Sequence, residues 1–154
     1  MTLLQQITAN QTLMSGVVGW TVAQVLKTLL DISLNRSFNP ERLVGSGGMP
    51  SSHSATVCAL TTAAGLCYGL ESFEFSISFL LAMIVMYDAM NVRRETGEQS
   101  KILNQMIRQW MDEGSKHAPI LADHKLKELV GHTPVEVLSG AAVGICMGLM
   151  IPIL

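Results

Sequence analysis

Four long apolar segments set the strongest limit on what this chain can fold into. Each has about 18 to 21 residues, so at 1.5 Å per residue a helix of that length crosses the roughly 30 Å hydrocarbon layer of a bilayer. Charged residues make up only 14% of the chain, compared with about 25% in ordinary soluble domains. We therefore predict an all-α fold, an integral membrane helical bundle of about four transmembrane helices that forms a single domain over residues 1–154. The segments are Leu13 to Leu30, Ser51 to Leu70, Phe73 to Met90, and Pro134 to Leu154.

Two of the segments carry small residues at every fourth position. Lipid gives helices no hydrophobic reason to associate, so rows of small side chains that allow close approach are typical of helix contacts in membranes. Either row taken alone is also consistent with a helix that is merely rich in small residues. The rows are Ala55, Ala59 and Ala63 in the second segment and Gly140, Gly144 and Gly148 in the fourth.

The placement of positive charge indicates an orientation. All ten lysines and arginines lie at or in the two connections that share one side, after the first and after the third segment. The positive-inside rule therefore predicts a multi-pass protein of the cell membrane, with both termini outside and both basic connections in the cytoplasm. A net charge of −2 and the lack of a basic stripe argue against nucleic acid as a partner.

The connection after the third segment contains a further helical pattern. Between residues 102 and 111, apolar side chains recur on one face while polar side chains fill the other. This pattern predicts a short amphipathic interfacial helix that lies in the membrane plane. If the membrane prediction failed, the same pattern would fit a helix facing the core of a soluble protein.

The three cysteines all lie within apolar segments. Their odd number and their spacing predict neither a disulfide framework nor a zinc site. We therefore expect Cys58, Cys67 and Cys146 to be small buried residues.

Ionisable residues at the segment ends are the candidate functional groups. His53 begins the second segment, Asp88 ends the third, and His132 directly precedes the fourth. The pair Arg93 and Arg94 follows Asp88, and the topology brings all five residues to one membrane face. Because ionisable groups in or against a membrane are costly and rare, such a cluster favours a functional site.

Two of the predicted helix starts have distinctive sequences. In GSGGMPSSHS, Pro50 suits the first turn of a helix, and the unpaired N–H groups of that turn form a ready anion site. In GHTPVEVLSG, the residues Thr133, Pro134 and Glu136 predict a capping box. Capping alone accounts for Glu136, but it does not account for His132.

The stretches GGMPSSHSA, YDAMNVRRETGEQ and GHTPVEVLSGAAVG together resemble the divergent branch of the type 2 phosphatidic acid phosphatase (PAP2) superfamily, the relatives of acid phosphatases and vanadium-dependent haloperoxidases. The resemblance covers about residues 20 to 150. The superfamily's Pro-Ser-Gly-His motif corresponds here to Pro50 through His53, with serine in place of glycine. Its nucleophilic histidine is followed four residues later by aspartate, and His132 and Glu136 match that pattern with glutamate instead.

The resemblance implies metal-independent hydrolysis of a lipid phosphate or diphosphate at the cytoplasmic face, without a cofactor. His132 would attack phosphorus to form a phosphohistidine, Glu136 would orient His132, and His53 would protonate the leaving oxygen. Asp88 would hold one of the arginines in place. Membrane lipid and a phosphorylated lipid substrate are the expected partners. The implied phosphate ligands are Ser51, Ser52, Gly48, Arg93, Arg94, and Lys27 or Arg42.

The chain departs from the superfamily pattern at two places. Leu126 occupies the position of an arginine six residues before the nucleophile, and Leu34 stands where an Arg-Pro pair follows the lysine of the first motif. Either Arg93 and Arg94 replace this phosphate clamp, or hydrolysis has been lost. Since four spans are fewer than the six common in the superfamily, a homo-oligomer could close the site.

Two alternatives to a metal-independent phosphatase remain open. The first is a membrane protein that binds phosphate or anionic lipid without cleaving it. The second is a metal-dependent phosphohydrolase that uses Asp88, Glu95 and the two histidines, because the DAMNVRRE stretch also offers oxygen ligands.

Overall fold

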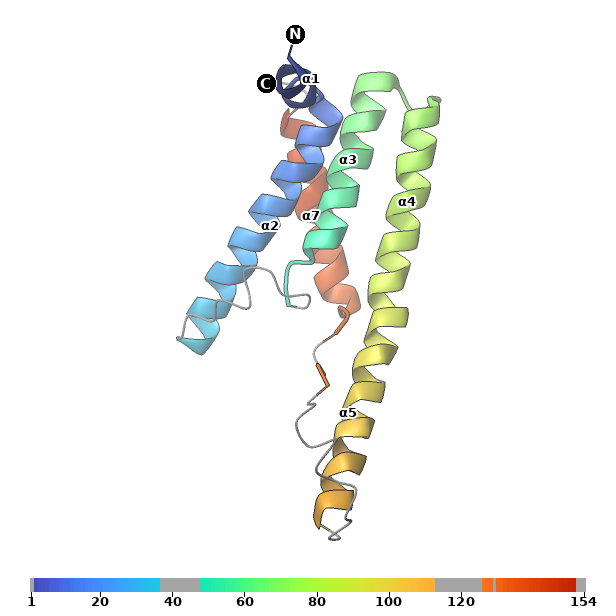
Figure 1. Cartoon of the computed structure of the whole chain (residues 1–154). Coiled ribbons are helices and arrows are strands. Elements are labelled where there is room, and N and C mark those ends of the chain that lie inside the picture. Colours follow the sequence, from blue (N-terminus) through green and yellow to red (C-terminus); the bar gives the residue numbers. More distant parts are fainter. Residues whose placement is uncertain (1, 37–47, 113–125, 129, 152–154) are drawn as a thin grey trace.

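The apolar segments predicted from the sequence are helices in the computed structural model, which describes residues 2–36, 48–112, 126–128 and 130–151. Within these residues every regular element is helical, which confirms the all-α prediction. The four helices of the predicted segments form a bundle, and a short N-terminal helix that was not predicted precedes them (Figure 1). The helices are α1 (Leu3–Thr8), α2 (Gln11–Asn35), α3 (Ser52–Tyr68), α4 (Phe73–Met90), α5 (Val92–Asp112) and α7 (Pro134–Met150).

Polar side chains define where the helices begin. Asn10 caps α2 and Ser72 caps α4, and each side-chain oxygen accepts a hydrogen bond from the N–H three residues later. Such caps satisfy N–H groups of the first turn that have no partner inside the helix. Ser51 caps α3 in the same way. Pro50 therefore lies before the cap, and the prediction that it belongs to the first turn of the helix is wrong.

Helix α3 contacts α2, α4 and α7. Its Ala55, Ala59 and Ala63 side chains are fully buried. A β-carbon at Gly144 of α7 would meet the carbonyl oxygen of Ala55. One at Gly148 would lie 2.7 Å from the carbonyl oxygen of Ala59. The two rows of small residues are therefore packing faces, as predicted, and they bring the backbones of α3 and α7 into contact.

Helix α5 continues from α4 and extends beyond the end of the bundle (Figure 1). It has 21 residues and starts at Val92, well before the predicted amphipathic stretch. Ile102, Met106 and Trp110 on its apolar face are exposed. The helix therefore does not turn across the end of the bundle as predicted for an interfacial helix. The reason is local, because only Asn91 separates it from α4 and no loop is present to redirect the chain.

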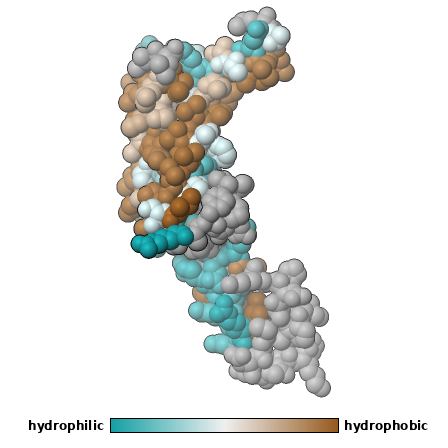
Figure 2. All heavy atoms as spheres, turned by 90° about the vertical axis from the view of Figure 1, so that its left-hand side faces the viewer, coloured by the Kyte–Doolittle hydropathy of each residue, from teal (hydrophilic) through white to brown (hydrophobic). Residues whose placement is uncertain are grey.

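The outer surface of the bundle is largely apolar. Figure 2 shows hydrophobic residues over its upper part and hydrophilic residues gathered toward the end at which α5 projects. Among the described residues, the stretches Gln11–Leu34 and Phe73–Trp110 are long and apolar enough to cross a bilayer, while Pro134–Met150 is shorter. On α4, Leu80 and Ile84 are 57% and 66% exposed, as expected of side chains that face lipid.

The cysteines only partly follow the prediction. Cys58 is buried in α3, but Cys67 and Cys146 are exposed. Burial of all three is therefore wrong. The two exposed thiols lie on apolar helices, where cysteine behaves as a small hydrophobic residue.

Replacing Gly144 by alanine should destabilise the bundle. Alanine normally favours a helix over glycine by about 1 kcal/mol. Here its β-carbon has to displace the α3 backbone, and such overpacking costs about 1 to 3 kcal/mol. We expect Gly144→Ala to lower the thermal unfolding midpoint of the protein in detergent.

The matched control is Gly16→Ala in α2. The nearest atom to a β-carbon at Gly16 is 3.6 Å away, so this variant should keep or raise the midpoint. Equal midpoints for the two variants would contradict the close contact of α3 and α7.

Candidate functional site

Backbone hydrogen bonds join three helix ends at the end of the bundle where α5 begins. The N–H of Ser51 donates to the carbonyl oxygen of Glu136 at 3.0 Å, which joins the start of α3 to the first turn of α7. The N–H of His132 donates to the carbonyl oxygen of Ala89 at 2.9 Å, which joins the residues before α7 to the last turn of α4. These bonds bring together predicted site residues that are far apart in the sequence.

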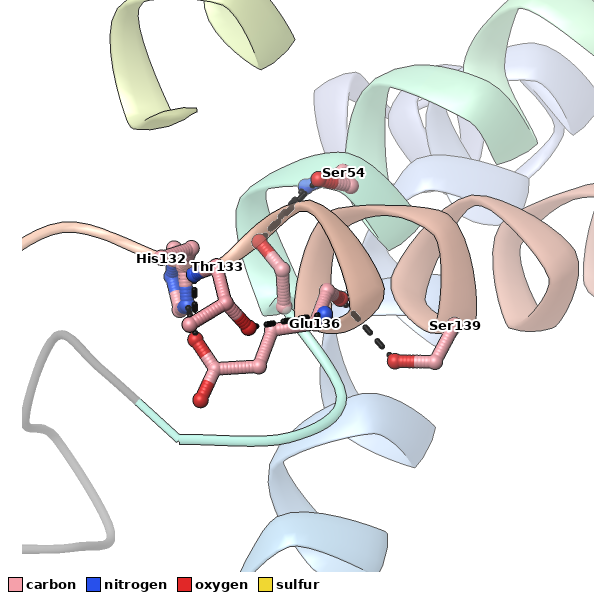
Figure 3. A network of polar contacts seen from close by, with 6 residues as sticks. Ser54, His132, Thr133, Glu136 and Ser139 are labelled. Atoms are coloured by element: carbon pink, nitrogen blue, oxygen red, sulfur yellow. Dashed lines mark hydrogen bonds and ion pairs between the residues drawn. The ribbon is translucent and has the colours of Figure 1, made fainter. Parts of the chain in front are cut away.

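One oxygen of the Glu136 carboxylate contacts two groups (Figure 3). Its Oε2 accepts a hydrogen bond from the Thr133 N–H at 2.9 Å and lies 3.2 Å from Nδ1 of His132. The Thr133 hydroxyl accepts a hydrogen bond from the Glu136 N–H at 3.4 Å, and Pro134 takes the first helical position. The predicted capping box is therefore confirmed. Capping and contact with histidine are not alternatives, since the same carboxylate does both.

The His132 side chain is buried, with only 2% of the residue exposed. Burial lowers the pKa of its imidazole below the usual 6.5, although Glu136 raises it, and the cations Lys27 and Arg93 lower it further. The ring is therefore neutral at neutral pH, and its Nδ1–H donates to the carboxylate. Nε2 then carries the lone pair.

No described residue forms a hydrogen bond with Nε2 of His132, which is buried. A buried polar atom without a partner costs about 1 to 3 kcal/mol of stability. Such atoms are rare in folded proteins, and a reactive role is one of the reasons for which they persist. Nε2 of His132 is therefore the candidate reactive atom of the site.

The second predicted histidine lies beside the first. The ring centroids of His53 and His132 are 6.1 Å apart, with 62° between the ring planes. Within the described part of the chain, Nδ1 of His53 is also buried without a hydrogen-bond partner. Lys27, which is 2% exposed in α2, and Arg93 of α5 are close enough to influence the charge of both rings. Two histidines and two cations from four separate segments thus converge.

Asp88 forms an ion pair with one of the two arginines. The Nε–H of Arg93 donates to Oδ2 of Asp88 at 2.6 Å, and both side chains are partly exposed. This bond uses one of the five N–H groups of the guanidinium. The others can bind an anion while the carboxylate fixes the direction of the side chain.

A polar pocket of about 330 Å³ lies beside His132, between α5 and the start of α7. Arg94 lines the pocket near Glu98, and its side chain forms no hydrogen bond with another described residue. Its guanidinium is therefore available to an anion that enters the pocket. The rest of the lining comprises Gly48, Glu98, Lys101, Glu128, Val130, Gly131, Thr133 and Glu136.

Two carboxylates in this lining, which were not predicted, are already bound to neighbours. Glu98 forms an ion pair with Lys101 at 2.8 Å, and this bond lowers the pKa of Glu98. Glu128 accepts a hydrogen bond from the Asn104 amide at 2.8 Å. Both contacts reduce the repulsion that an entering anion would meet. The only sequence signal was the i, i+3 spacing of Glu98 and Lys101, which says nothing about their distance from His132.

Asn104 also holds the segment before His132 against α5. Its Nδ2 donates to the carbonyl oxygen of Leu126 at 3.0 Å, and its Oδ1 accepts from the Leu126 N–H at 3.1 Å. Further along, Gly131 has φ 90° and lies against the Arg94 backbone with no room for a β-carbon. Leu126, which stands where the superfamily has an arginine, is therefore fixed against α5. The same helix supplies Arg94 to the pocket.

The remaining predicted phosphate ligands have different positions. Ser51 and Ser52 are buried at the start of α3, and the Ser51 hydroxyl accepts bonds from the N–H and hydroxyl of Ser54. Gly48 has φ 84° and lines the pocket. Arg42 lies outside the described residues. The serine hydroxyl that caps α3 is thus engaged by its own helix.

The metal-dependent alternative names Asp88, Glu95 and the two histidines as ligands, and all four lie in the described part of the chain. In that part of the chain, no three side chains of histidine, cysteine, aspartate or glutamate come together as metal ligands. Asp88 is paired with Arg93, and Glu95 is exposed.

Comparison with known proteins agrees with the resemblance seen in the motifs. Residues 8–147 match the Divergent PAP2 family. The chain is 37% identical over 153 residues to the membrane protein YuiD of Bacillus subtilis (strain 168), and the alignment covers 95% of this chain and 96% of that relative. No solved structure matches the chain. The chain therefore belongs to the Divergent PAP2 family of membrane proteins.

Proposed function

We propose that this protein hydrolyses a lipid phosphate or diphosphate at the cytoplasmic face of the membrane through a phosphohistidine. The observation that carries the proposal is the state of His132. Its Nδ1 lies 3.2 Å from the Glu136 carboxylate, and its buried Nε2 has no partner among the described residues. Attack on phosphorus requires a neutral histidine whose free lone pair is oriented by a carboxylate on the other nitrogen.

The reaction then has two steps. In the first, Nε2 of His132 attacks phosphorus, the bond from phosphorus to the lipid oxygen breaks, and His53, in its protonated form, donates its proton to that oxygen. The phosphorylated imidazole carries a positive charge, which the Glu136 carboxylate stabilises through Nδ1–H. In the second, water attacks phosphorus, the P–N bond breaks, His53 takes a proton from the water, and inorganic phosphate leaves.

Cations from two helices would neutralise the phosphate oxygens. Positioning and charge stabilisation account for most of the catalysis of phosphoryl transfer. Lys27 of α2 and Arg93 lie near the two histidines, and Arg94 lines the adjoining pocket. These residues would replace the superfamily's arginine, whose position is taken by Leu126.

We also assign the orientation of the bundle from charge. The site lies at the end that carries the basic connections, so this end faces the cytoplasm, and α1 and the α3–α4 turn face outward. Helices α3 and α7 have 17 residues each. Their length of about 26 Å is slightly less than the roughly 30 Å hydrocarbon layer, so four spans require only modest thinning of the bilayer.

Loss of the nucleophile should abolish hydrolysis. Purified protein should release phosphate from phosphatidate, phosphatidylglycerophosphate or a polyprenyl diphosphate in the presence of a metal chelator. His132→Ala should lower the rate of phosphate release by about three orders of magnitude or more. Val135→Ala, at a position 65% exposed in the first turn of α7, is the control and should keep the wild-type rate. Wild-type protein inactive on all three substrates would refute hydrolysis.

Glu136→Gln should separate capping from catalysis. Glutamine takes the same place in a capping box, so the thermal midpoint should stay near that of the wild type. Its amide cannot hold His132 in the required tautomer, and the comparable change in a catalytic triad costs about 10⁴ in kcat. We expect kcat to fall by about two to four orders of magnitude. A lower midpoint with unchanged kcat would mean that Glu136 serves only as a cap.

Arg94 and Arg108 provide a matched pair on α5. A hydrogen bond to a charged group contributes about 1.5 to 3 kcal/mol, so Arg94→Ala should lower kcat/KM by about 10- to 100-fold. Arg108 is exposed outside the pocket, and Arg108→Ala should change kcat/KM by less than about twofold. Equal effects of the two substitutions would count against phosphate binding in the pocket.

A further inference from the structure

A second cavity, of about 570 Å³, lies between α3, α4 and α7 and opens to the outer surface of the bundle, where its lining residues Leu66 and Met83 are about half exposed. Its lining is apolar and includes Leu66, Phe75, Phe79, Met83, Met86 and Ile145. Two threonines also line it, but their hydroxyls donate to backbone carbonyl oxygens of α3, Thr61 to Val57 at 2.7 Å and Thr62 to Cys58 at 2.8 Å. The cavity therefore offers hydrocarbon surface and no hydrogen-bonding group that lacks a partner.

Measured along the helix axes, the cavity begins within two helical turns of the polar site on all three helices. On α3 its first lining residue, Cys58, follows His53 by five residues, which is about 7.5 Å along the helix axis. On α4 it includes Met86, two residues before Asp88. On α7 it includes Ala141, five residues after Glu136. Along the helix axes, the cavity thus begins about one and a half helical turns from the level of the histidines, in the direction of the α3–α4 turn.

The length of the cavity matches that of a lipid chain. From Met86 to Phe75, both of which line it, α4 rises about 16 Å. One leaflet of a bilayer has a hydrocarbon layer of about 15 Å, half of the total thickness. A chain whose phosphate lies beside His132 would therefore extend from the cytoplasmic end of the bundle to about the middle of the membrane.

We infer that this cavity holds one hydrocarbon chain of a lipid phosphate whose headgroup occupies the site at His132. The inference rests on the proposed function and adds the place of the substrate's tail. An amphiphile with an anionic head matches both the cations near the histidines and the apolar walls beyond them. A helix from a second copy of the chain would match only the walls.

The cavity positions the lipid phosphate and adds little to the affinity for it. Lipid tails are as apolar as the side chains of the bundle, so a chain that moves from the bilayer into the cavity gains little free energy. A chain held there fixes the depth and direction of the attached phosphate, and such positioning accelerates a reaction.

Photocross-linking in lipid nanodiscs tests this inference. The probe is dodecyl phosphate with a diazirine near the end of its chain, and labelled residues are identified by mass spectrometry. We expect labels on cavity residues such as Leu66 and Phe79, and we expect unlabelled dodecyl phosphate to compete. Met83→Trp, which narrows the cavity, should reduce labelling at least fivefold. Ile84→Trp changes the next residue, which is 66% exposed and outside the cavity, and should leave labelling unchanged.

Several outcomes would overturn the inference. Equal labelling of the outer face of α4, or labelling that Met83→Trp does not reduce, would show that the chain remains in the bilayer. If Met83→Trp instead separated a dimer without changing the labels, the cavity would belong to a contact between copies.

Failure of the proposed function gives a different result. Phosphate release from p-nitrophenyl phosphate, which has no chain, reports on the polar site alone. Release without cavity labelling would overturn only the position of the tail. Cavity labelling by both dodecyl phosphate and its alcohol analogue, with no phosphate release, would refute hydrolysis and support the cavity as a chain site.

Discussion

Contact between the backbones of α3 and α7 determines the rest of the arrangement. A β-carbon at Gly140 would meet the carbonyl oxygen of Ser51, and the later glycines of α7 lie as close to α3. Because the helices touch at this level, the Ser51 N–H reaches the carbonyl oxygen of Glu136. The starts of α3 and α7 are therefore neighbours. His53 lies in the first turn of α3, and His132 directly precedes the cap of α7. A larger residue in the glycine row would separate the same groups that form the site.

The position of Glu136 explains how one residue can have two roles. The third helical residue is where glutamate reaches back to the N-cap in a capping box, and the residue four positions earlier is His132. The capping oxygen therefore also contacts Nδ1 of His132. Aspartate, which the wider superfamily has here, is one methylene shorter. The longer side chain of glutamate is consistent with a carboxylate that both caps α7 and contacts His132.

The motifs predicted much of the geometry of this candidate site because that geometry depends on local spacing. The capping box, the Asp88 and Arg93 pair and the convergence of two histidines follow from positions near helix ends. Asn104 could not be predicted, because its role depends on hydrogen bonds with Leu126 and Glu128, more than twenty positions away. Glu98 and Lys101 could not be predicted either, because only the tertiary structure places them in the pocket lining. Hydrophobic periodicity located the amphipathic part of α5 but not its start or direction, since both depend on the single residue that joins it to α4.

The sequence by itself determined the apolar segments, the caps and the rows of small residues, because these depend on composition and on spacing within one helix. The resemblance offered Lys27 and Arg94 among several phosphate ligands, and the tertiary structure decided that Lys27, from within α2, lies near both histidines and that Arg94 lines a pocket beside His132. It also decided that an apolar cavity opens between α3, α4 and α7. Such features depend on distances between helices, and these distances are set by backbone contacts that no single segment encodes.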